Sequence, residues 1–169
     1  MRAEAFTEAF AHSGRALWVI ASAWVGRDEA EDLVQETARV AWQRRQQLRS
    51  GDPPGPWLAA ITRRLGANWR RRRRPEVRAE EALPERVSSS LEQAEWPFDV
   101  DRAGLSDELA AALARLPEVA RASLLLHVVL GYGFAEVGEM LGINENTAAS
   151  HARRARLQLR EALTPVEER

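Results

Sequence analysis

The chain has 169 residues, of which 45% are hydrophobic, and its formal net charge at pH 7 is −1. That length suits one ordinary domain or two small ones, and the hydrophobic fraction argues against disorder throughout. Because cysteine is absent, the sequence excludes a disulfide framework and a thiolate metal site, and it fits a reducing intracellular compartment. The three histidines, His12, His127 and His151, lack the spacing of metal ligands, so we expect no metal site.

The positive charge of the chain is concentrated at one end. All 24 basic side chains are arginines, because the sequence has no lysine. Residues 1–74 hold 14 arginines against 8 acidic residues, residues 75–104 hold 3 against 8, and residues 105–169 hold 7 against 9. The segments therefore carry formal charges of +6, −5 and −2, which predicts a basic module, an acidic linker and a mixed module.

The first predicted helix covers residues 3–25, where apolar side chains recur with a period of about 3.6 residues. The apolar run at 16–25 resembles the core of a secretory signal. However, it is too short to span a bilayer, and it follows Glu4 and Glu8 instead of a basic flank. We therefore expect a buried helix face and no membrane insertion. The predicted stripe consists of Phe6, Phe10, Leu17, Ile20, Ala21 and Trp24.

A second helix is predicted with Asp28 as its N-cap, because Glu31 follows three residues later as in a capping box. We expect this helix to end at Ser50 and Gly51. Its predicted buried stripe consists of Leu33, Val34, Thr37, Val40, Ala41 and Leu48.

A third helix is predicted to begin at Pro56, because the prolines of segment 52–56 should keep that segment out of a helix. Apolar residues from Trp57 to Trp69 supply its buried stripe. The helix should then run on through five consecutive arginines until Pro75, namely Arg70, Arg71, Arg72, Arg73 and Arg74. Taken alone, such a basic helix fits a nucleic-acid backbone, a solvated helix end or an anionic membrane surface.

Residues 75–104 are predicted to form a flexible acidic linker, because they hold prolines, a serine triplet and an excess of acidic residues. The sequence assigns no role to Trp96 or Phe98 within it. Further helices are predicted at 107–116, from 117 to 130, at 135–141 and at 145–163. The last two are separated by a short glycine-containing turn, which is the layout of a helix-turn-helix motif.

The last predicted helix has two distinct faces. Its inner face consists of Ala148, Ala152, Ala155 and Leu159, which recur at helical spacing and can close a small core. Its outer face consists of Thr147, Ser150, His151, Arg154 and Gln158. Two interpretations stay open from these residues: a recognition helix for the DNA major groove, and an amphipathic helix of an ordinary all-α bundle.

Three segments together carry a family resemblance. They are DEAEDLVQETARVAWQ at 28–43, WLAAITRRLGANWRRRRR at 57–74, and residues 113–163, which end in LGINENTAASHARRARLQLREAL. They resemble the extracytoplasmic-function class of bacterial RNA polymerase sigma factors. The resemblance implies an all-α fold of two small helical domains joined by a flexible acidic linker, with a helix-turn-helix in the C-terminal domain. The implied parts are a region 2-like domain at 1–74, the linker at 75–104 and a region 4-like domain at 105–169.

The resemblance also implies which side chains meet which partner. The residues implied to bind core RNA polymerase are Asp32, Gln35, Glu36 and Arg39, with Trp42 packing near them. Those implied to bind the −10 promoter element are Arg63, Arg64, Asn68, Arg70, Arg71, Arg72, Arg73 and Arg74, beside a base-capturing loop at about 48–56. Those implied to bind the −35 element as duplex are Thr147, Ser150, His151, Arg153 and Arg154.

The implied partners are core RNA polymerase, promoter DNA and an anti-sigma factor. The implied location is the bacterial cytoplasm, at the nucleoid through the polymerase, and no cofactor or catalytic residue is implied.

Two other functions stay open. Alanines in the last helix, such as Ala149, suit a sigma-like decoy that titrates an anti-sigma factor. A stand-alone helix-turn-helix regulator would not need the Asp32 surface. An enzyme is disfavoured, because the sequence has no constellation of nucleophile, base and orienting group.

Overall fold

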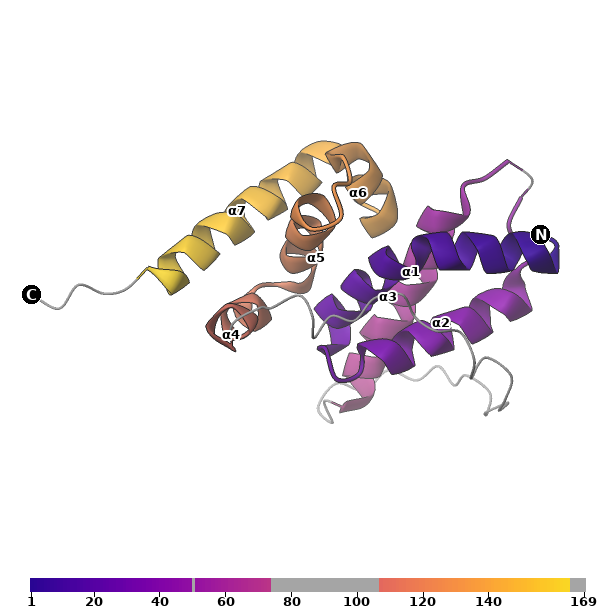
Figure 1. Ribbon diagram of the computed structural model, residues 1–169, viewed down its shortest axis with the longest axis horizontal. Coiled ribbons are helices and arrows are strands. Elements are labelled where there is room, and N and C mark those ends of the chain that lie inside the picture. The colour runs from indigo at the N-terminus through magenta and orange to yellow at the C-terminus, as the bar shows by residue number, and fades with distance from the viewer. Residues whose placement is uncertain (50, 74–106, 165–169) are drawn as a thin grey trace, which may run out of the picture.

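The computed structural model describes residues 1–49, 51–73 and 107–164. The predicted acidic linker and Arg74 lie outside these described residues. Within the described ranges the chain forms seven α-helices and no strands, so the all-α prediction is confirmed. Their bounds are α1 Ala3–Val25, α2 Ala30–Arg44, α3 Pro54–Arg73, α4 Asp107–Arg115, α5 Glu118–Val128, α6 Phe134–Leu141 and α7 Glu145–Leu163 (Figure 1).

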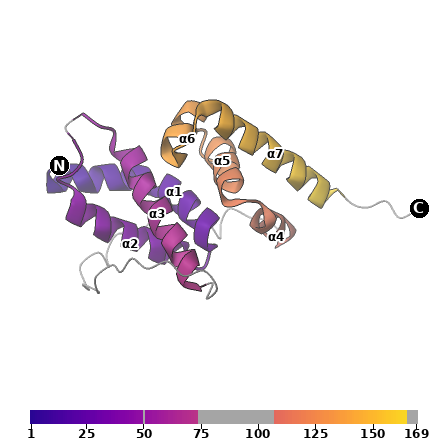
Figure 2. The same cartoon turned by 180° about the vertical axis from the view of Figure 1, so that it is seen from behind.

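Helix α1 runs inward from the N-terminal end of the structure and packs against α2, α3 and α5 (Figure 2). Its bounds match the predicted helix at 3–25, and Leu17 and Ile20 of the predicted stripe are fully buried. Helix α3 approaches α1 very closely at Gly66, where an added Cβ would lie 2.8 Å from the Cβ of Trp24. A glycine at this position therefore sets the separation of the two helices.

Helix α2 differs from its prediction at both ends. The predicted capping box at Asp28 is wrong, because the N-cap is Glu29 and no side chain caps the helix. The helix also ends at Arg44 instead of Ser50. Beyond Ala41, which is fully buried, the next apolar position of the predicted stripe is the half-buried Leu48. A further helical turn would therefore bury little apolar surface to offset its ordering.

Helix α3 begins at Pro54, two residues before the predicted start at Pro56. The first N–H groups of a helix have no intrahelical acceptor, so prolines in the first turn remove no backbone hydrogen bond. The helix continues to Arg73, which confirms a helical basic run as far as the structure describes it.

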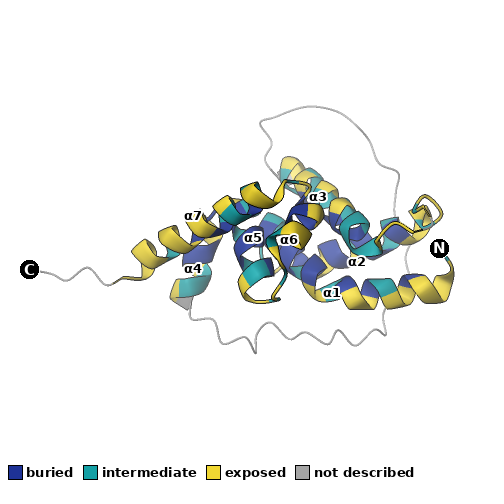
Figure 3. Ribbon diagram, turned by 90° about the horizontal axis from the view of Figure 1, so that it is seen from above, coloured by how far each residue is buried: buried dark blue, intermediate teal, exposed yellow. Residues whose placement is uncertain are grey.

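One core joins the two halves of the chain, α1 to α3 and α4 to α7. Helix α1 packs against α5 and α3 packs against α6, as the buried faces in Figure 3 indicate. The same cluster contains Leu17 and Leu33 from the first half and Leu126 and Val137 from the second. A second, smaller cluster lies within the C-terminal half and consists of Leu113, Leu116, Ala120, Leu124 and Ala155. The domain boundaries at 74 and 105 stay predictions.

Helices α6 and α7 form the predicted helix-turn-helix arrangement. The turn begins at Gly142, whose φ of 65° is left-handed, and the backbone N–H of Ile143 donates to the carbonyl of Gly138 at 2.9 Å. Asn144 then caps α7, because its Oδ1 accepts from the backbone N–H of Thr147 at 2.8 Å. A glycine and a side-chain cap thus set the angle between the two helices.

We expect Asn144→Ala to lower the free energy of unfolding by about 1 kcal/mol, because a helix N–H loses its acceptor. Urea denaturation followed by circular dichroism measures this change. Asn146→Ala is the matched control, since Asn146 is exposed in the first turn of the same helix and the structure gives it no capping bond. Equal losses in both variants would contradict the capping role of Asn144.

Candidate polymerase and DNA interfaces

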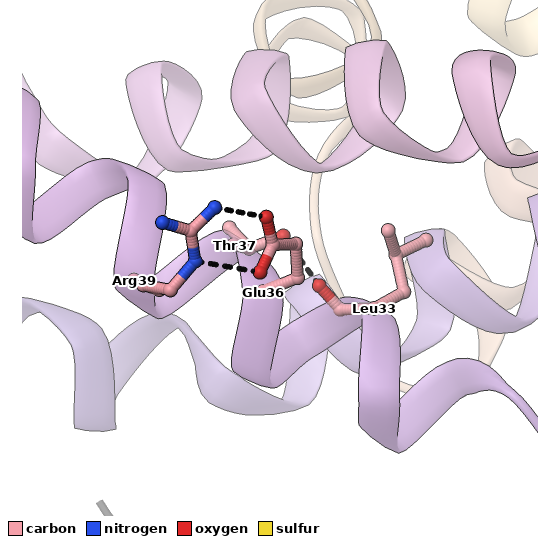
Figure 4. Close-up of polar contacts among 4 residues, drawn as sticks. All are labelled: Leu33, Glu36, Thr37 and Arg39. Atoms are coloured by element: carbon pink, nitrogen blue, oxygen red, sulfur yellow. Dashed lines mark hydrogen bonds and ion pairs between the residues drawn. The ribbon is translucent and has the colours of Figure 1, made fainter. Parts of the chain in front are cut away.

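The residues predicted to bind polymerase lie along one side of α2, and we call them the α2 face: Asp32, Gln35, Glu36 and Arg39. Asp32 and Gln35 are exposed, whereas Glu36 and Arg39 are half-buried. The Nε of Arg39 donates to Glu36 Oε2 at 2.8 Å, and its Nη2 donates to Oε1 at 2.5 Å (Figure 4). The structure therefore brings all four predicted residues onto one surface.

The bidentate ion pair changes the electrostatics of the α2 face. The hydrogen bond from Arg39 to Glu36 raises the pKa of Arg39 above its ordinary value. Both oxygens of the Glu36 carboxylate are occupied by this bond, while Asp32 presents its carboxylate to solvent. Asp32 is thus better placed than Glu36 to attract a basic partner surface. On the buried side of the same helix, the hydroxyl of Thr37 donates to the carbonyl of Leu33 at 2.8 Å.

Trp42 lies one turn after Arg39 on α2, and the packing predicted for it is confirmed. Its ring packs edge-on against Phe6 with centroids 5.3 Å apart, and the guanidinium of Arg45 lies 4.0 Å from the ring centroid. Even so, 39% of Trp42 is exposed. Its position three residues after Arg39 places it near that side chain on the helix.

The basic residues of α3 divide between two sides of the helix. Arg64, Arg71 and Arg72 are exposed. Asn68 accepts a hydrogen bond from Arg71. By contrast, Arg63 and Arg70 contact the C-terminal half. They are seven residues apart, so they lie on the same side of α3. The predicted −10 residues therefore do not form a single open surface in this structure; the side chain of Arg73 lies outside what the structure describes.

Arg63 is held at the end of α6. Its Nη1 donates to the carbonyl of Leu141 at 2.5 Å, and its guanidinium lies where a side chain at Gly142 would be. Burial lowers the pKa of Arg63, since desolvation disfavours the charged form. In this arrangement the half-buried Arg63 is engaged by a protein carbonyl.

The residues predicted to contact the −35 element lie along α7, and we call them the α7 face: Thr147, Ser150, His151, Arg153 and Arg154. Ser150, Arg153 and Arg154 are exposed and the other two are half-buried. The inner alanines Ala148, Ala152 and Ala155 are buried, as predicted. The α7 face is therefore available to a duplex, while the small inner side chains let α7 lie close to its neighbours.

Other kinds of site are sparse in the described part of the chain. None of the helices there is long and apolar enough to cross a membrane. Histidine and acidic side chains in the same residues form no group that could hold a metal ion.

Known families match both halves in the expected order. A model described as Sigma-70 region 2 matches residues 9–76, and one described as Sigma-70, region 4 matches residues 106–159. The ECF RNA polymerase sigma factor SigF of Caulobacter vibrioides is 32% identical over 136 residues, which cover 80% of this chain and 71% of SigF. The chain belongs to the extracytoplasmic-function (ECF) family of RNA polymerase sigma factors.

A second relative and a solved structure are also similar to this chain. SigE of Mycolicibacterium smegmatis is 37% identical over 138 residues, which cover 80% of this chain and 52% of SigE. The chain thus spans about half the length of that relative. The sigma factor RpoE of Bartonella quintana, solved in complex with the anti-sigma factor NepR, aligns with a TM-score of 0.66 and 24% identity, covering 95% of this chain and 97% of RpoE. At that identity the likeness is one of fold.

Proposed function

We propose that this protein is an alternative sigma factor that binds core RNA polymerase and directs promoter recognition and transcription initiation. The observation that carries the proposal is the match to region 2 and region 4 in order on one chain. The exposed acidic side chain on α2 and the exposed arginines on α3 and α7 support it. Under this proposal the protein performs no chemical step of its own, and the polymerase supplies the catalysis.

The α2 face is the proposed contact with core polymerase. A surface with one exposed carboxylate and one internal ion pair has a defined charge pattern, which selects a partner of complementary charge and rejects others. Trp42 adds a large exposed ring beside that pattern. Aromatic side chains are enriched where interfaces gain most of their binding energy, so we assign Trp42 to the same contact.

The basic side chains of α3 are the proposed contacts with the −10 element. Arginines along a helix neutralise phosphates and release counterions, which favours binding of an opened strand. Arg64, Arg71 and Arg72 are exposed for that purpose. The remaining members of the proposed set are Arg63, Asn68, Arg70, Arg73 and Arg74. The segment at about 48–56, whose last three residues lie in α3, is the proposed pocket for an unstacked base.

The α7 face is the proposed contact with the −35 element. A helix that follows a short turn presents its N-terminal residues to the base edges of the major groove. Ser150 and Arg153 can donate to bases or phosphates from exposed positions. The proposal also includes an anti-sigma factor as a partner and a location in the bacterial cytoplasm, at the nucleoid through the polymerase.

The test is run-off transcription with purified core RNA polymerase and this protein on fragmented genomic DNA, followed by sequencing of the transcript starts. Discrete starts that share an upstream bipartite motif are the expected result. Core binding without such transcripts would favour a decoy that titrates an anti-sigma factor. The absence of core binding would overturn the proposed function.

A further inference from the structure

A partly exposed tryptophan at the end of α2 is held by contacts from two other side chains. The ring of Phe6 in α1 packs against Trp42 at 73° with ring centroids 5.3 Å apart, and the guanidinium carbon of Arg45 lies 4.0 Å from the Trp42 ring centroid. Even so, 39% of Trp42 is exposed. We call Phe6, Trp42 and Arg45 the Trp42 cluster. It restrains a large aromatic ring and leaves part of that ring accessible.

The end of α2 determines where Arg45 lies. Arg45 directly follows the helix, and its backbone N–H and its Nη1 both donate to the carbonyl of Trp42, at 3.3 Å and 2.9 Å. Carbonyls in the last turn of a helix lack intrahelical donors, and the partial negative charge there attracts a cation. Residues three positions apart lie on the same side of a helix. The guanidinium therefore covers the ring of the same residue whose carbonyl it binds.

The core of the protein fixes the other contact of the Trp42 cluster. Phe6 is only 6% exposed, and it stacks on Phe10 with ring centroids 5.9 Å apart. Edge-to-face and cation–π contacts each favour a particular orientation of the aromatic ring. Because Phe6 is packed into the core, its place does not depend on Arg45. Arg45 therefore supplies the restraint on Trp42 that a substitution can remove without disturbing the core.

A ring that is restrained before binding has an advantage in an interface. Ordering of a mobile side chain opposes association, and fixing the side chain in advance reduces that cost. Aromatic side chains are also among the residues on which binding energy is concentrated. Trp42 lies three residues after Arg39, the last residue of the α2 face, on the same helix. The restraint on Trp42 therefore acts at the edge of the surface proposed for core polymerase.

We propose that Arg45 is a positioning residue that holds the ring of Trp42 against Phe6, so that Trp42 meets core RNA polymerase as a preformed anchor. The use of this anchor rests on the proposed function, whereas the restraint rests on the contacts of the Trp42 cluster. An arginine that only capped α2 would stabilise the helix without controlling the ring. The experiment therefore has one arm without polymerase and a second arm with it.

The first arm measures the mobility of the Trp42 ring by NMR on protein labelled with ¹⁵N-tryptophan. The chain has six tryptophans, and Trp42 is assigned by the indole signal that disappears in Trp42→Phe. Arg45→Ala should lower the ¹⁵N–¹H nuclear Overhauser effect of this signal, because the indole gains motion on the ps–ns timescale. Arg45→Lys keeps a cation near the ring and should restore part of the effect. Arg44→Ala removes the same charge from an exposed neighbouring site and should leave the effect unchanged.

The second arm is a double-mutant cycle on core binding, measured by fluorescence titration of labelled core polymerase. Arg45→Ala should weaken binding about fivefold, which corresponds to the ordering of one large side chain. Trp42→Ala should weaken binding about tenfold. Addition of Arg45→Ala to Trp42→Ala should then change the affinity by less than about 1.5-fold, because the ring on which Arg45 acts is gone. Arg44→Ala should bind within about twofold of the unchanged protein.

Circular dichroism and urea unfolding check the fold of each variant, because Trp42→Ala also removes a contact of Phe6. Trp42→Leu is the second variant for the cycle. It keeps an apolar side chain beside Phe6 and still removes the aromatic ring on which Arg45 lies.

The outcomes separate positioning from direct contact and from failure of the proposed function. An unchanged Trp42 signal in Arg45→Ala would overturn the restraint. A more mobile ring with unchanged affinity would overturn its use in binding. An equal loss from Arg45→Ala with and without Trp42 would overturn positioning in favour of direct contact between Arg45 and polymerase. Absence of core binding by the unchanged protein would overturn the proposed function, and the first arm would still decide the restraint.

Discussion

Asp32→Arg is expected to weaken binding to core RNA polymerase at least about 100-fold, because like charges set against each other at an interface oppose binding by several kcal/mol. The substitution acts on the exposed carboxylate of the α2 face. Glu36→Arg should have a similar effect, but it also breaks the ion pair with Arg39, so Asp32 gives the cleaner test. Folding should be little affected, since exposed substitutions usually change stability by less than about 0.5 kcal/mol.

Fluorescence titration of labelled core polymerase measures this loss. Glu8→Arg is the matched control, because Glu8 is an exposed acid on α1 and its replacement makes the same change in net charge. We expect the control to bind within about twofold of the unchanged protein, since a rim or remote charge contributes little. Comparable losses in both variants would mean that overall charge, and not the α2 face, controls the binding.

Gly138→Ala is expected to destabilise the helix-turn-helix by about 3 kcal/mol, an ordinary magnitude for overpacking at a tight contact. An added Cβ would lie 2.7 Å from the carbonyl oxygen of Ile143 and 3.3 Å from both the carbonyl carbon of Asn144 and the backbone nitrogen of Glu145. These atoms belong to the turn, so the turn must shift to relieve the clash. Because the turn orients α7, binding to duplex DNA through the α7 face should be lost as well.

Thermal and urea unfolding measure the loss in stability, and Glu139→Ala supplies the control. Glu139 is an exposed residue of α6 directly after Gly138. Because alanine suits a helix and the site is exposed, this variant should change stability by less than about 0.5 kcal/mol. A Gly138→Ala protein of unchanged stability would contradict the close approach of the turn to α6.

The helices with long apolar stripes were predictable from the sequence. The bounds of α1 and α7 match their predictions, because α1 buries a stripe from Phe6 to Ala23 and α7 begins at the Asn144 cap and buries its inner alanines. The end of α2 was not predictable in this way, since the apolar period continues to Leu48 in the sequence but the residues between Ala41 and Leu48 bury little apolar surface. Burial in three dimensions, and not the period alone, decides where a helix stops.

The candidate site was predictable in its residue types and less so in its arrangement. Helical spacing alone placed the α2 face on one surface. The inward position of Arg63 was not predictable, because its partner Leu141 is 78 residues away along the chain. An arginine on a basic helix looks the same in the sequence whether it faces a phosphate or a distant carbonyl. The roles given to these side chains stay predictions until binding is measured.

The bond between Arg63 and the carbonyl of Leu141 also has a thermodynamic consequence. It joins the helix proposed for one promoter element to the turn that orients the helix proposed for the other. If the two halves are separated in only a fraction of the molecules, the apparent affinity of every ligand that binds only the separated form falls in proportion to that fraction. Polymerase and DNA that both favour separated halves must then strengthen each other's binding by the same factor, even where they do not touch. Cooperativity between two partners would thus arise from an internal contact that neither of them shares.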